Sequence, residues 1–344
     1  MSKRLLYVLP LARYMQAHWT DRIRATIDAG YEVHIAVPFD AELTPALFRG
    51  AVLHDIPLHR GLPSLVAELR CLLAIFRLLR GLRPDLVHAV TIRPVAYAGL
   101  AARLLRAPAV LHSLTGLGYL YSGEGPLARF MRWSAERLLR FVFGHDNAQV
   151  LFENPDDCAL LVSRAVVPAA KTSVFIGSGL DLDVFSFCAA PETQPPLVVL
   201  PSRLIAPKGV HEFVAAARLL KAEGVSARFA LVGEGDAGNP DSIAQATLDA
   251  WAREGAVECW GWQDDIVTVL RAASIVCLPS WYREGAPRIL IEAAAIGRPA
   301  VTTDWPGCRD VVSDGVTGLL VPPHDVTALA EALRRLIADP ALRR

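Results

Sequence analysis

The clearest chemical signal in this sequence is a pair of glutamates eight residues apart, Glu284 and Glu292. Gly285 and Pro287 follow the first of them, and proline is well suited to the first turn of a helix. A helix through both carboxylates would separate them by roughly 12 Å. That separation suits two hydroxyl-bearing groups, such as a hexose and a ribose, on either side of a diphosphate. Free N–H groups at the helix start, around Gly285 and Ala286, would bind the diphosphate itself.

An ordinary surface helix is the alternative interpretation of this segment. Glu284 would then be a favourable first-turn acid, and Glu292 a solvated side chain. The neighbours of Glu292 argue against it, because residues 289–291 and 293–295 are all apolar. A carboxylate in such surroundings needs a partner.

Two cations, Arg203 and Lys208, lie five residues apart after the apolar run 197–200. Arginine offers planar, bidentate contacts and lysine a point charge, so together they can hold a diphosphate. They can also stabilise the charge that develops as a nucleotide leaves. Alone, one arginine and one lysine on a loop would be unremarkable. Their position at a strand end of the domain that also carries the glutamates favours the functional interpretation.

Apolar runs alternate with helical patterns along the whole chain, which predicts two doubly wound α/β domains. We place the first domain at 1–188, a Pro-rich linker at 189–196 and the second domain at 197–344. Ligands in such sheets bind beyond the carboxyl ends of the strands. The predicted strands are 5–9, 33–37, 51–56, 86–90, 109–114, 149–152, 173–176, 197–200, 228–232, 257–260, 275–278 and 299–302. Helices are predicted at 16–29, 64–82, 94–106 and 126–143 in the first domain, and between the strands of the second.

Composition excludes several classes of protein. The net charge of +0 gives no reason to expect a nucleic-acid binder. The charge is uneven, however, with 20 Lys and Arg against 16 Asp and Glu up to Cys188, and 15 against 19 after it. Six cysteines without a C-x-x-C pair suit a reducing cytoplasm. The sequence contains no stretch of 18 apolar residues, so we expect no transmembrane helix.

The predicted helices 64–82 and 126–143 combine leucine and phenylalanine with several arginines. Basic amphipathic helices can lie on an anionic membrane surface. A helix packed on a sheet has much the same pattern, so both interpretations stay open. Their occurrence in the positively charged half is the observation that supports the membrane interpretation, but it does not place that interpretation above the other.

These motifs together resemble the donor site of glycosyltransferase family 4, whose GT-B fold places two Rossmann-like domains on either side of a central cleft. The resemblance implies a retaining, metal-independent transferase that uses a nucleotide sugar, with UDP favoured by analogy. It implies that Arg203 and Lys208 bind the donor diphosphate, that Glu292 binds ribose, and that Glu284 lies near the transferred sugar. The segments that carry the resemblance are Arg203 with Lys208-Gly209, Gly233-Glu234-Gly235, Pro279-Ser280, Arg283-Glu284-Gly285, Glu292 and 314–323.

Motifs of the first half are similar to a bacterial subgroup of this family. Its members add N-acetylgalactosamine or a related sugar to saccharides linked to undecaprenyl diphosphate. The resemblance thus implies a lipid-linked saccharide acceptor, surface-glycan or glycoprotein-glycan synthesis, and work at the inner face of the cytoplasmic membrane. The motifs are 115–119, 152–157 and 177–182, and Thr115, Gly116, Gly118 and Tyr119 are the predicted acceptor contacts.

The first domain also departs from the family pattern. Many members have a histidine in a T-x-H-G loop, where this chain reads Ser113-Leu114-Thr115-Gly116. His112 is therefore a candidate catalytic or donor-contacting residue, with a strand histidine in the core as the alternative. For the metal, Asp181-Leu182-Asp183 is an Asp-x-Asp sequence but lies next to the linker, so we expect no metal site.

Two other functions fit parts of the sequence. Gly233 to Gly238 matches G-x-G-x-x-G, which is typical of NAD-dependent oxidoreductases. Pro240 argues against it, because proline there removes an N–H from the helix that should follow. A nucleotide-sugar 2-epimerase, or a silent subunit that binds nucleotide without turnover, would keep the fold but perform no transfer.

Overall fold

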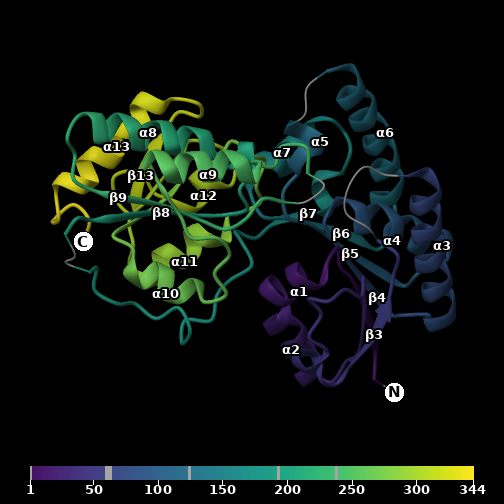
Figure 1. Cartoon of the computed structure of the whole chain (residues 1–344). Coiled ribbons are helices and arrows are strands. Elements are labelled where there is room, and N and C mark those ends of the chain that lie inside the picture. Colours follow the sequence, from purple (N-terminus) through teal and green to yellow (C-terminus); the bar gives the residue numbers. More distant parts are fainter. Residues whose placement is uncertain (1, 59–63, 123–124, 192–193, 237–238) are drawn as a thin grey trace. The chain divides into compact units, whose positions relative to one another are not determined.

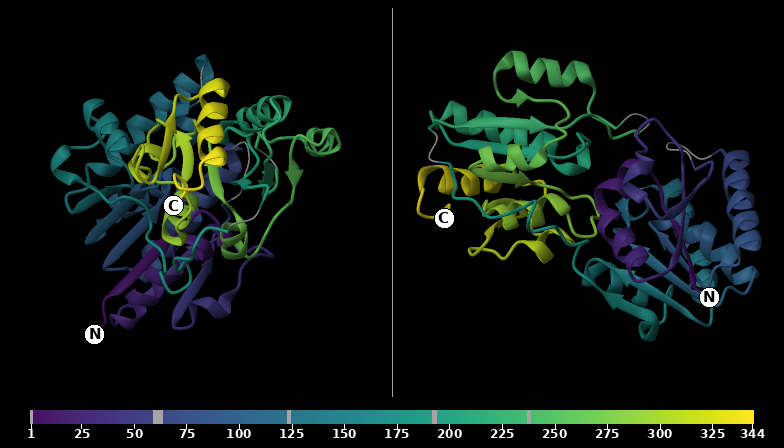
Figure 2. Two further views of the ribbon diagram at one scale, coloured as in Figure 1. Left: turned by 90° about the vertical axis from the view of Figure 1, so that its left-hand side faces the viewer. Right: turned by 90° about the horizontal axis from the view of Figure 1, so that it is seen from below.

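The computed structural model describes residues 2–58, 64–122, 125–191, 194–236 and 239–344. It divides into two compact units, residues 1–178 and 179–344. Both are parallel α/β sheets with helices on their two faces (Figures 1 and 2). This confirms the predicted fold class.

In the first unit, the described strands form one sheet in the order β3-β2-β1-β4-β5-β6-β7. Strands buried on both faces pack alternate side chains into different cores. Leu6 and Val8 of β1 pack with α3, α4 and α6, whereas Leu5 and Tyr7 pack with α1 and α2. The elements are β1 (Arg4–Val8), α1 (Ala12–His18), α2 (Thr20–Asp28), β2 (Glu32–Val37), β3 (Ala51–Asp55), α3 (Leu65–Leu82), β4 (Leu86–Val90), α4 (Ile92–Leu104), β5 (Ala109–Leu114), α5 (Gly118–Ser122), α6 (Pro126–Phe143), β6 (Ala148–Phe152), α7 (Pro155–Ser163) and β7 (Thr172–Val174).

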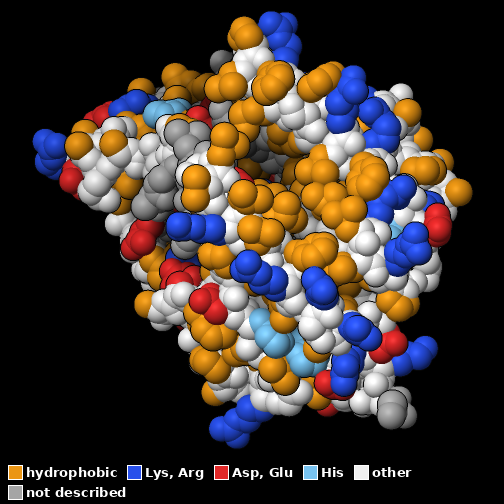
Figure 3. Space-filling model, turned by 90° about the vertical axis from the view of Figure 1, so that its right-hand side faces the viewer, with side chains coloured by type: hydrophobic (Ala, Val, Ile, Leu, Met, Phe, Trp, Pro, Cys, Tyr) orange, Lys and Arg blue, Asp and Glu red, His pale blue; other side chains and the backbone are white. Residues whose placement is uncertain are grey.

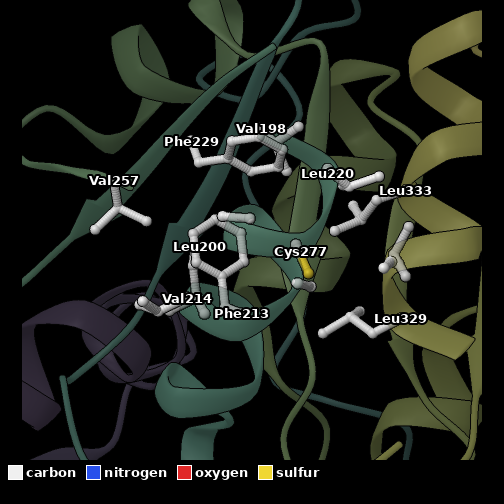
Figure 4. Packing of buried hydrophobic residues seen from close by; sticks show 14 of the residues in the cluster. Val198, Leu200, Phe213, Val214, Leu220, Phe229, Val257, Cys277, Leu329 and Leu333 are labelled. Atoms are coloured by element: carbon white, nitrogen blue, oxygen red, sulfur yellow. The ribbon is translucent and has the colours of Figure 1, made fainter. Parts of the chain in front are cut away.

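In the second unit, the strand order is β10-β9-β8-β11-β12-β13. The core on one face is lined by strand residues such as Val198 and Cys277 and covered by α8, α9 and α13 (Figure 4). The other face packs against α10 and α11. The elements are β8 (Leu197–Pro201), α8 (Val210–Ala222), β9 (Arg228–Val232), α9 (Gln245–Glu254), β10 (Glu258–Cys259), α10 (Ile266–Ala272), β11 (Ile275–Leu278), α11 (Arg288–Ile296), β12 (Ala300–Thr303), α12 (Cys308–Val311), β13 (Gly318–Val321) and α13 (Val326–Ala338).

Two predicted boundaries differ from the structure. The helix expected at 16–29 is two helices, α1 and α2, separated at Trp19, whose ring is buried against Tyr7 and His88. The segment 179–188, which we placed with the first domain, packs on the second unit instead. Phe185 enters its core, and the buried Arg298 donates a hydrogen bond to the carbonyl of Cys188 (2.9 Å). The boundary between the two units therefore lies about ten residues before the Pro-rich segment.

Candidate active site

The predicted donor residues of the second unit follow two neighbouring strands. β8 and β11 pair in parallel, so the loops after them begin side by side at the carboxyl edge of the sheet. The carbonyl of Pro207 joins the two loops, because it accepts hydrogen bonds from the amides of Trp281 (2.9 Å) and Tyr282 (3.1 Å). The Ser280 hydroxyl also donates to it (3.2 Å). The residue after Pro207 is thereby fixed against the loop that carries Glu284.

Lys208 and Glu284 form an ion pair across these loops. Their side chains are only 12% and 13% exposed, so water screens the two charges weakly. The Ser280 hydroxyl also lies 3.1 Å from Oε1 of Glu284, so its one proton is shared between this carboxylate and the Pro207 carbonyl. The structure thus brings together two predicted site residues that lie 76 positions apart in the sequence.

Gly307, in the loop after β12, supports the backbone around Glu284. Its φ is +86°, and a Cβ there would lie 2.4 Å from the carbonyl oxygen of Gly285 and 2.8 Å from that of Glu284. A larger residue would push the 284–285 segment away from the strand ends. No sequence pattern predicted a role for this residue, since a single glycine in a loop carries no local signal.

Glu292 lies on α11 and is buried, with 6% of its surface exposed. Its carboxylate accepts a hydrogen bond from Nε of Arg288 at 2.7 Å, one helical turn earlier. Burial raises the pKa of Glu292, and the adjacent Arg288 opposes that rise. The structure therefore contradicts a solvated Glu292 and supplies the partner that an apolar environment demands.

Glu284 is not part of that helix. α11 begins at Arg288, with Pro287 at its N-cap, so Gly285 and Ala286 lie in the preceding loop together with Glu284. The prediction that one helix spans both glutamates was wrong, and so was the helical distance derived from it. Glu284 is instead positioned by the ion pair with Lys208 and the hydrogen bond from Ser280.

Arg203 has a different partner from Lys208. Its guanidinium contacts the carboxylate of Asp236 at 2.5 Å, and it is 48% exposed. Asp236 is held in place because its backbone N–H donates a hydrogen bond to the Ser242 hydroxyl oxygen (3.0 Å). Gly233 allows the loop after β9 to approach, since a Cβ there would lie 2.0 Å from the Ser202 carbonyl oxygen. Arg203 therefore lies at the same sheet edge as Lys208, with an exposed cation.

In the first unit, the predicted acceptor residues follow β5. The Thr115 hydroxyl accepts a hydrogen bond from Tyr14 (3.1 Å), a residue that the sequence analysis missed. Burial raises the pKa of Tyr14 to about 12, and the nearby Glu153 carboxylate contributes to that rise. Gly116 lies in the following loop and Gly118 opens α5. The backbone of Tyr119 is in α5, but its side chain lies outside the described residues.

His112 does not belong to this group. Its ring is completely buried in the core, against Phe143 and close to Gly99, and its nitrogens have no hydrogen-bond partner among the described residues. Burial lowers its pKa to about 3, so the ring is neutral at physiological pH. The catalytic or donor-contacting role proposed for His112 is corrected on this ground. It is a core histidine, although not one whose nitrogens are satisfied.

Comparison with known families gives two matches. A model described as "Glycosyl transferase 4-like" covers residues 4–147, and one described as "Glycosyl transferases group 1" covers residues 195–339. The chain is a family 4 glycosyltransferase. Solved structures agree on its GT-B fold. Sucrose-phosphate synthase from Thermosynechococcus elongatus matches with a TM-score of 0.78 at 22% identity, covering 99% of this chain and 91% of the other. Anabaena HepE in complex with UDP gives 0.75 at 18%, covering 100% and 92%.

Two curated proteins resemble this glycosyltransferase along most of its length. The N,N'-diacetylbacillosaminyl-diphospho-undecaprenol alpha-1,3-N-acetylgalactosaminyltransferase of Campylobacter jejuni is 28% identical over 93% of this chain and 86% of its own. The UDP-Gal:alpha-D-GlcNAc-diphosphoundecaprenol alpha-1,3-galactosyltransferase of Escherichia coli is 23% identical over 81% and 73%. Both names describe transfer to a lipid-linked saccharide.

Three further observations concern this glycosyltransferase. Among the described residues, no group of three His, Cys, Asp or Glu side chains could hold a metal ion. Within the same residues, no helix is both long and apolar enough to cross a bilayer. The glycines from Gly233 do not open a helix, since α9 begins only at Gln245, and Gly238 lies outside the described residues. The described part of this loop therefore lacks the helix start that a dinucleotide fingerprint requires.

Proposed function

We propose that this family 4 enzyme is a retaining, metal-independent glycosyltransferase that moves a hexose or N-acetylhexosamine from a UDP-sugar to a lipid-linked saccharide. The acceptor saccharide would be linked to polyprenyl diphosphate at the inner face of the cytoplasmic membrane. The product would enter a surface glycan or a glycoprotein glycan.

The Lys208–Glu284 pair is the observation that carries the proposal. A cation and an anion held almost out of water, at the carboxyl edge of a doubly wound sheet, suit a ligand that is both anionic and rich in hydroxyls. Lys208 would contact the diphosphate, and Glu284 would accept hydrogen bonds from the sugar. Arg203, with its exposed guanidinium, would contact the diphosphate from the same edge. Glu292 would hold the ribose hydroxyls.

The chemical step follows from these roles. The bond between the anomeric carbon and the diphosphate oxygen breaks, and the nucleotide leaves with the electron pair. The acceptor hydroxyl forms the new bond on the face that the nucleotide leaves, and its proton passes to the departing phosphate. Lys208 and Arg203 stabilise the negative charge that develops on the diphosphate. These two cations support metal independence, because they supply the charge that a divalent ion would otherwise provide.

The substrates in this proposal are inferred from the names of the relatives. The Escherichia coli relative is named for UDP-galactose, and both curated relatives are named for diphosphoundecaprenol-linked acceptors. In this chain, the acceptor saccharide would contact Thr115, Gly116, Gly118 and Tyr119. Tyr14 would orient the Thr115 hydroxyl through the hydrogen bond that joins them.

The deciding experiment is mass spectrometry of products from a panel of nucleotide sugars, each with and without a polyprenyl-diphosphate-linked saccharide. We expect one donor to extend the acceptor by one sugar. A donor consumed or isomerised without acceptor would identify an epimerase, and nucleotide binding without any product would identify a silent subunit. Lys208→Ala should abolish most transfer, whereas Lys221→Ala, a lysine on α8 that binds the Gly255 carbonyl, should not.

A further inference from the structure

α3 and α6 expose apolar side chains at positions that surface helices normally give to polar residues. Each helix has one buried stripe and one exposed stripe. The exposed stripe of α3 starts with leucine and valine, and that of α6 with leucine, phenylalanine and tryptophan. We call these seven residues the apolar patch; their exposed fractions range from 40% to 89%. They are Leu65, Val66, Leu69 and Leu73 on α3, and Leu127, Phe130 and Trp133 on α6.

The order of residues along the two exposed stripes is the same. The apolar patch occupies the first half of each helix, and arginines follow it: Arg77 and Arg80 on α3, Arg137 and Arg140 on α6. Both helices pack against α4, on the same face of the first unit's sheet. Figure 3 views this side of the molecule, with hydrophobic side chains gathered in its upper half and Lys and Arg side chains among and below them.

The apolar patch lies toward the carboxyl edge of the sheet. α3 leads from the carboxyl end of β3 to the start of β4, and α6 leads from β5 to β6. All four strands are parallel, so the first turns of both helices lie at the edge where the strands end. Thr115 follows β5 at this same edge. The patch and the predicted acceptor residues therefore share one end of the first unit.

The charge of these helices is strongly positive. Together they contain seven arginines and two glutamates. Both glutamates are paired, Glu68 with Arg93 and Glu136 with Arg164. Arg137 also lies over the Trp133 ring, at 4.2 Å from its centre. An apolar surface bordered by arginines is complementary to anionic phospholipids. A second copy of this chain is a poorer match, because it carries the same positive charge on this surface.

The spacing also fits the depth of a lipid interface. Leu69 and Arg77 are eight residues apart, which is about 12 Å along a helix. If the first turns of both helices enter the interface to a depth of roughly 5–10 Å, the usual depth of interfacial apolar groups, the later arginines lie at the level of the phosphates. Arg70 and Arg129, which lie within the apolar half, have stems long enough to extend their charges to the same level.

We propose that the apolar patch inserts into the surface of an anionic phospholipid bilayer, while the arginines that follow it bind the phosphates. This would place Thr115 at the membrane surface, where the diphosphate of a polyprenyl-linked saccharide lies. That consequence rests on the proposed acceptor; the binding of the bilayer does not.

The test is co-sedimentation of the full chain with vesicles of phosphatidylcholine, with and without phosphatidylglycerol, in the absence of any sugar nucleotide. We expect tight binding only with phosphatidylglycerol. Leu69→Ser with Phe130→Ser should weaken it by at least about a hundredfold, since two large apolar groups no longer insert. Phe39→Ser with Leu219→Ser, at sites of similar exposure, should leave it unchanged.

A charge variant tests the second half of the proposal. Arg77→Gln with Arg137→Gln should weaken binding to the anionic vesicles about thirty-fold. Arg253→Gln with Arg335→Gln is the matched control. Equal pelleting with both kinds of vesicle would overturn the proposal, as would unchanged binding by the Leu69 and Phe130 variant. The proposal would also be overturned if the wild type were a dimer and this variant dissociated it, because the apolar patch would then be a contact between two copies of the chain. Failure of sugar transfer alone would affect only the proposed function, because no step of the vesicle assay needs it.

Discussion

Replacing Glu284 by glutamine should separate the two functions that the ion pair with Lys208 joins. In the unliganded protein, Glu284 neutralises Lys208 and so competes with an incoming diphosphate. Glu284→Gln removes this competition but also removes the charged acceptor for sugar hydroxyls. Lys208→Ala instead removes the cation that both Glu284 and the diphosphate need.

The burial of the pair sets the size of these effects. Two unit charges about 4 Å apart interact by about 4 kcal/mol at an effective dielectric constant of 20. Lys208 and Glu284 are 12% and 13% exposed, so little of this is lost to solvent screening. In Lys208→Ala, water would take the place of the ammonium group beside the diphosphate and recover part of this energy. The variant should therefore bind UDP roughly a hundredfold more weakly. Glu284→Gln should bind UDP as tightly as the wild type, or up to about tenfold more tightly, while its transfer rate falls about a hundredfold.

Calorimetric titration with UDP and a steady-state transfer assay measure the two effects separately. Lys221→Ala is the control for the loss of a lysine elsewhere in the second unit. If Glu284→Gln weakens UDP binding as much as Lys208→Ala does, then Glu284 contacts the nucleotide itself. Our account of competition for Lys208 would then be refuted.

Three other predictions follow from buried groups and from the proposed mechanism. Burial raises the pKa of Glu292 above its ordinary 4.5, so the charged form destabilises the fold. As pH rises from about 5 to 8, the wild type should therefore lose thermal stability relative to Glu292→Gln. A difference in melting temperature that stays constant over this range would contradict this prediction. The pKa of His112 is lowered from 6.5 to about 3, so its neutral form stabilises the fold at neutral pH and this stability is lost on acidification. Between pH 7 and 5, wild type should lose about 2 kcal/mol more unfolding free energy than His112→Leu, whose transfer activity should be normal. EDTA should leave the transfer rate unchanged; a loss restored by a divalent cation would disprove metal independence.

Local patterns predicted most of the elements. Leu86–Val90, Ala109–Leu114, Arg228–Val232, Ile275–Leu278 and Pro126–Phe143 have the expected bounds, because a buried parallel strand or an amphipathic helix is encoded in consecutive residues. The missed break at Trp19 has a tertiary cause, since the buried indole packs on residues of two strands. β13 was also missed; its four residues follow a turn and give only a short apolar run.

The site residues also divide into those that the local sequence could predict and those that only tertiary contacts bring together. Arg288 could have been found from sequence, because it lies one helical turn before a glutamate in an apolar helix. Asp236 and Tyr14 could not, since their contacts with Arg203 and Thr115 span 33 and 101 residues. His112 shows the converse, because its nearness to the Thr115 loop in sequence suggested a functional role. β5 is covered on both faces, so a side chain within the strand points into the core and only residues beyond its end reach a ligand.

The sequence by itself determined the alternation of strands and helices, the two-unit organisation, and which charged residues follow strand ends. Each of these depends on runs of neighbouring residues. Only the tertiary structure decided that Lys208 meets Glu284, that Glu284 lies outside the helix of Glu292, and that the apolar halves of α3 and α6 share one edge. The physical reason is strand order. β8 and β11 are paired neighbours in the sheet, with Val199 beside Val276, although these two residues lie 77 positions apart in the sequence (276 − 199).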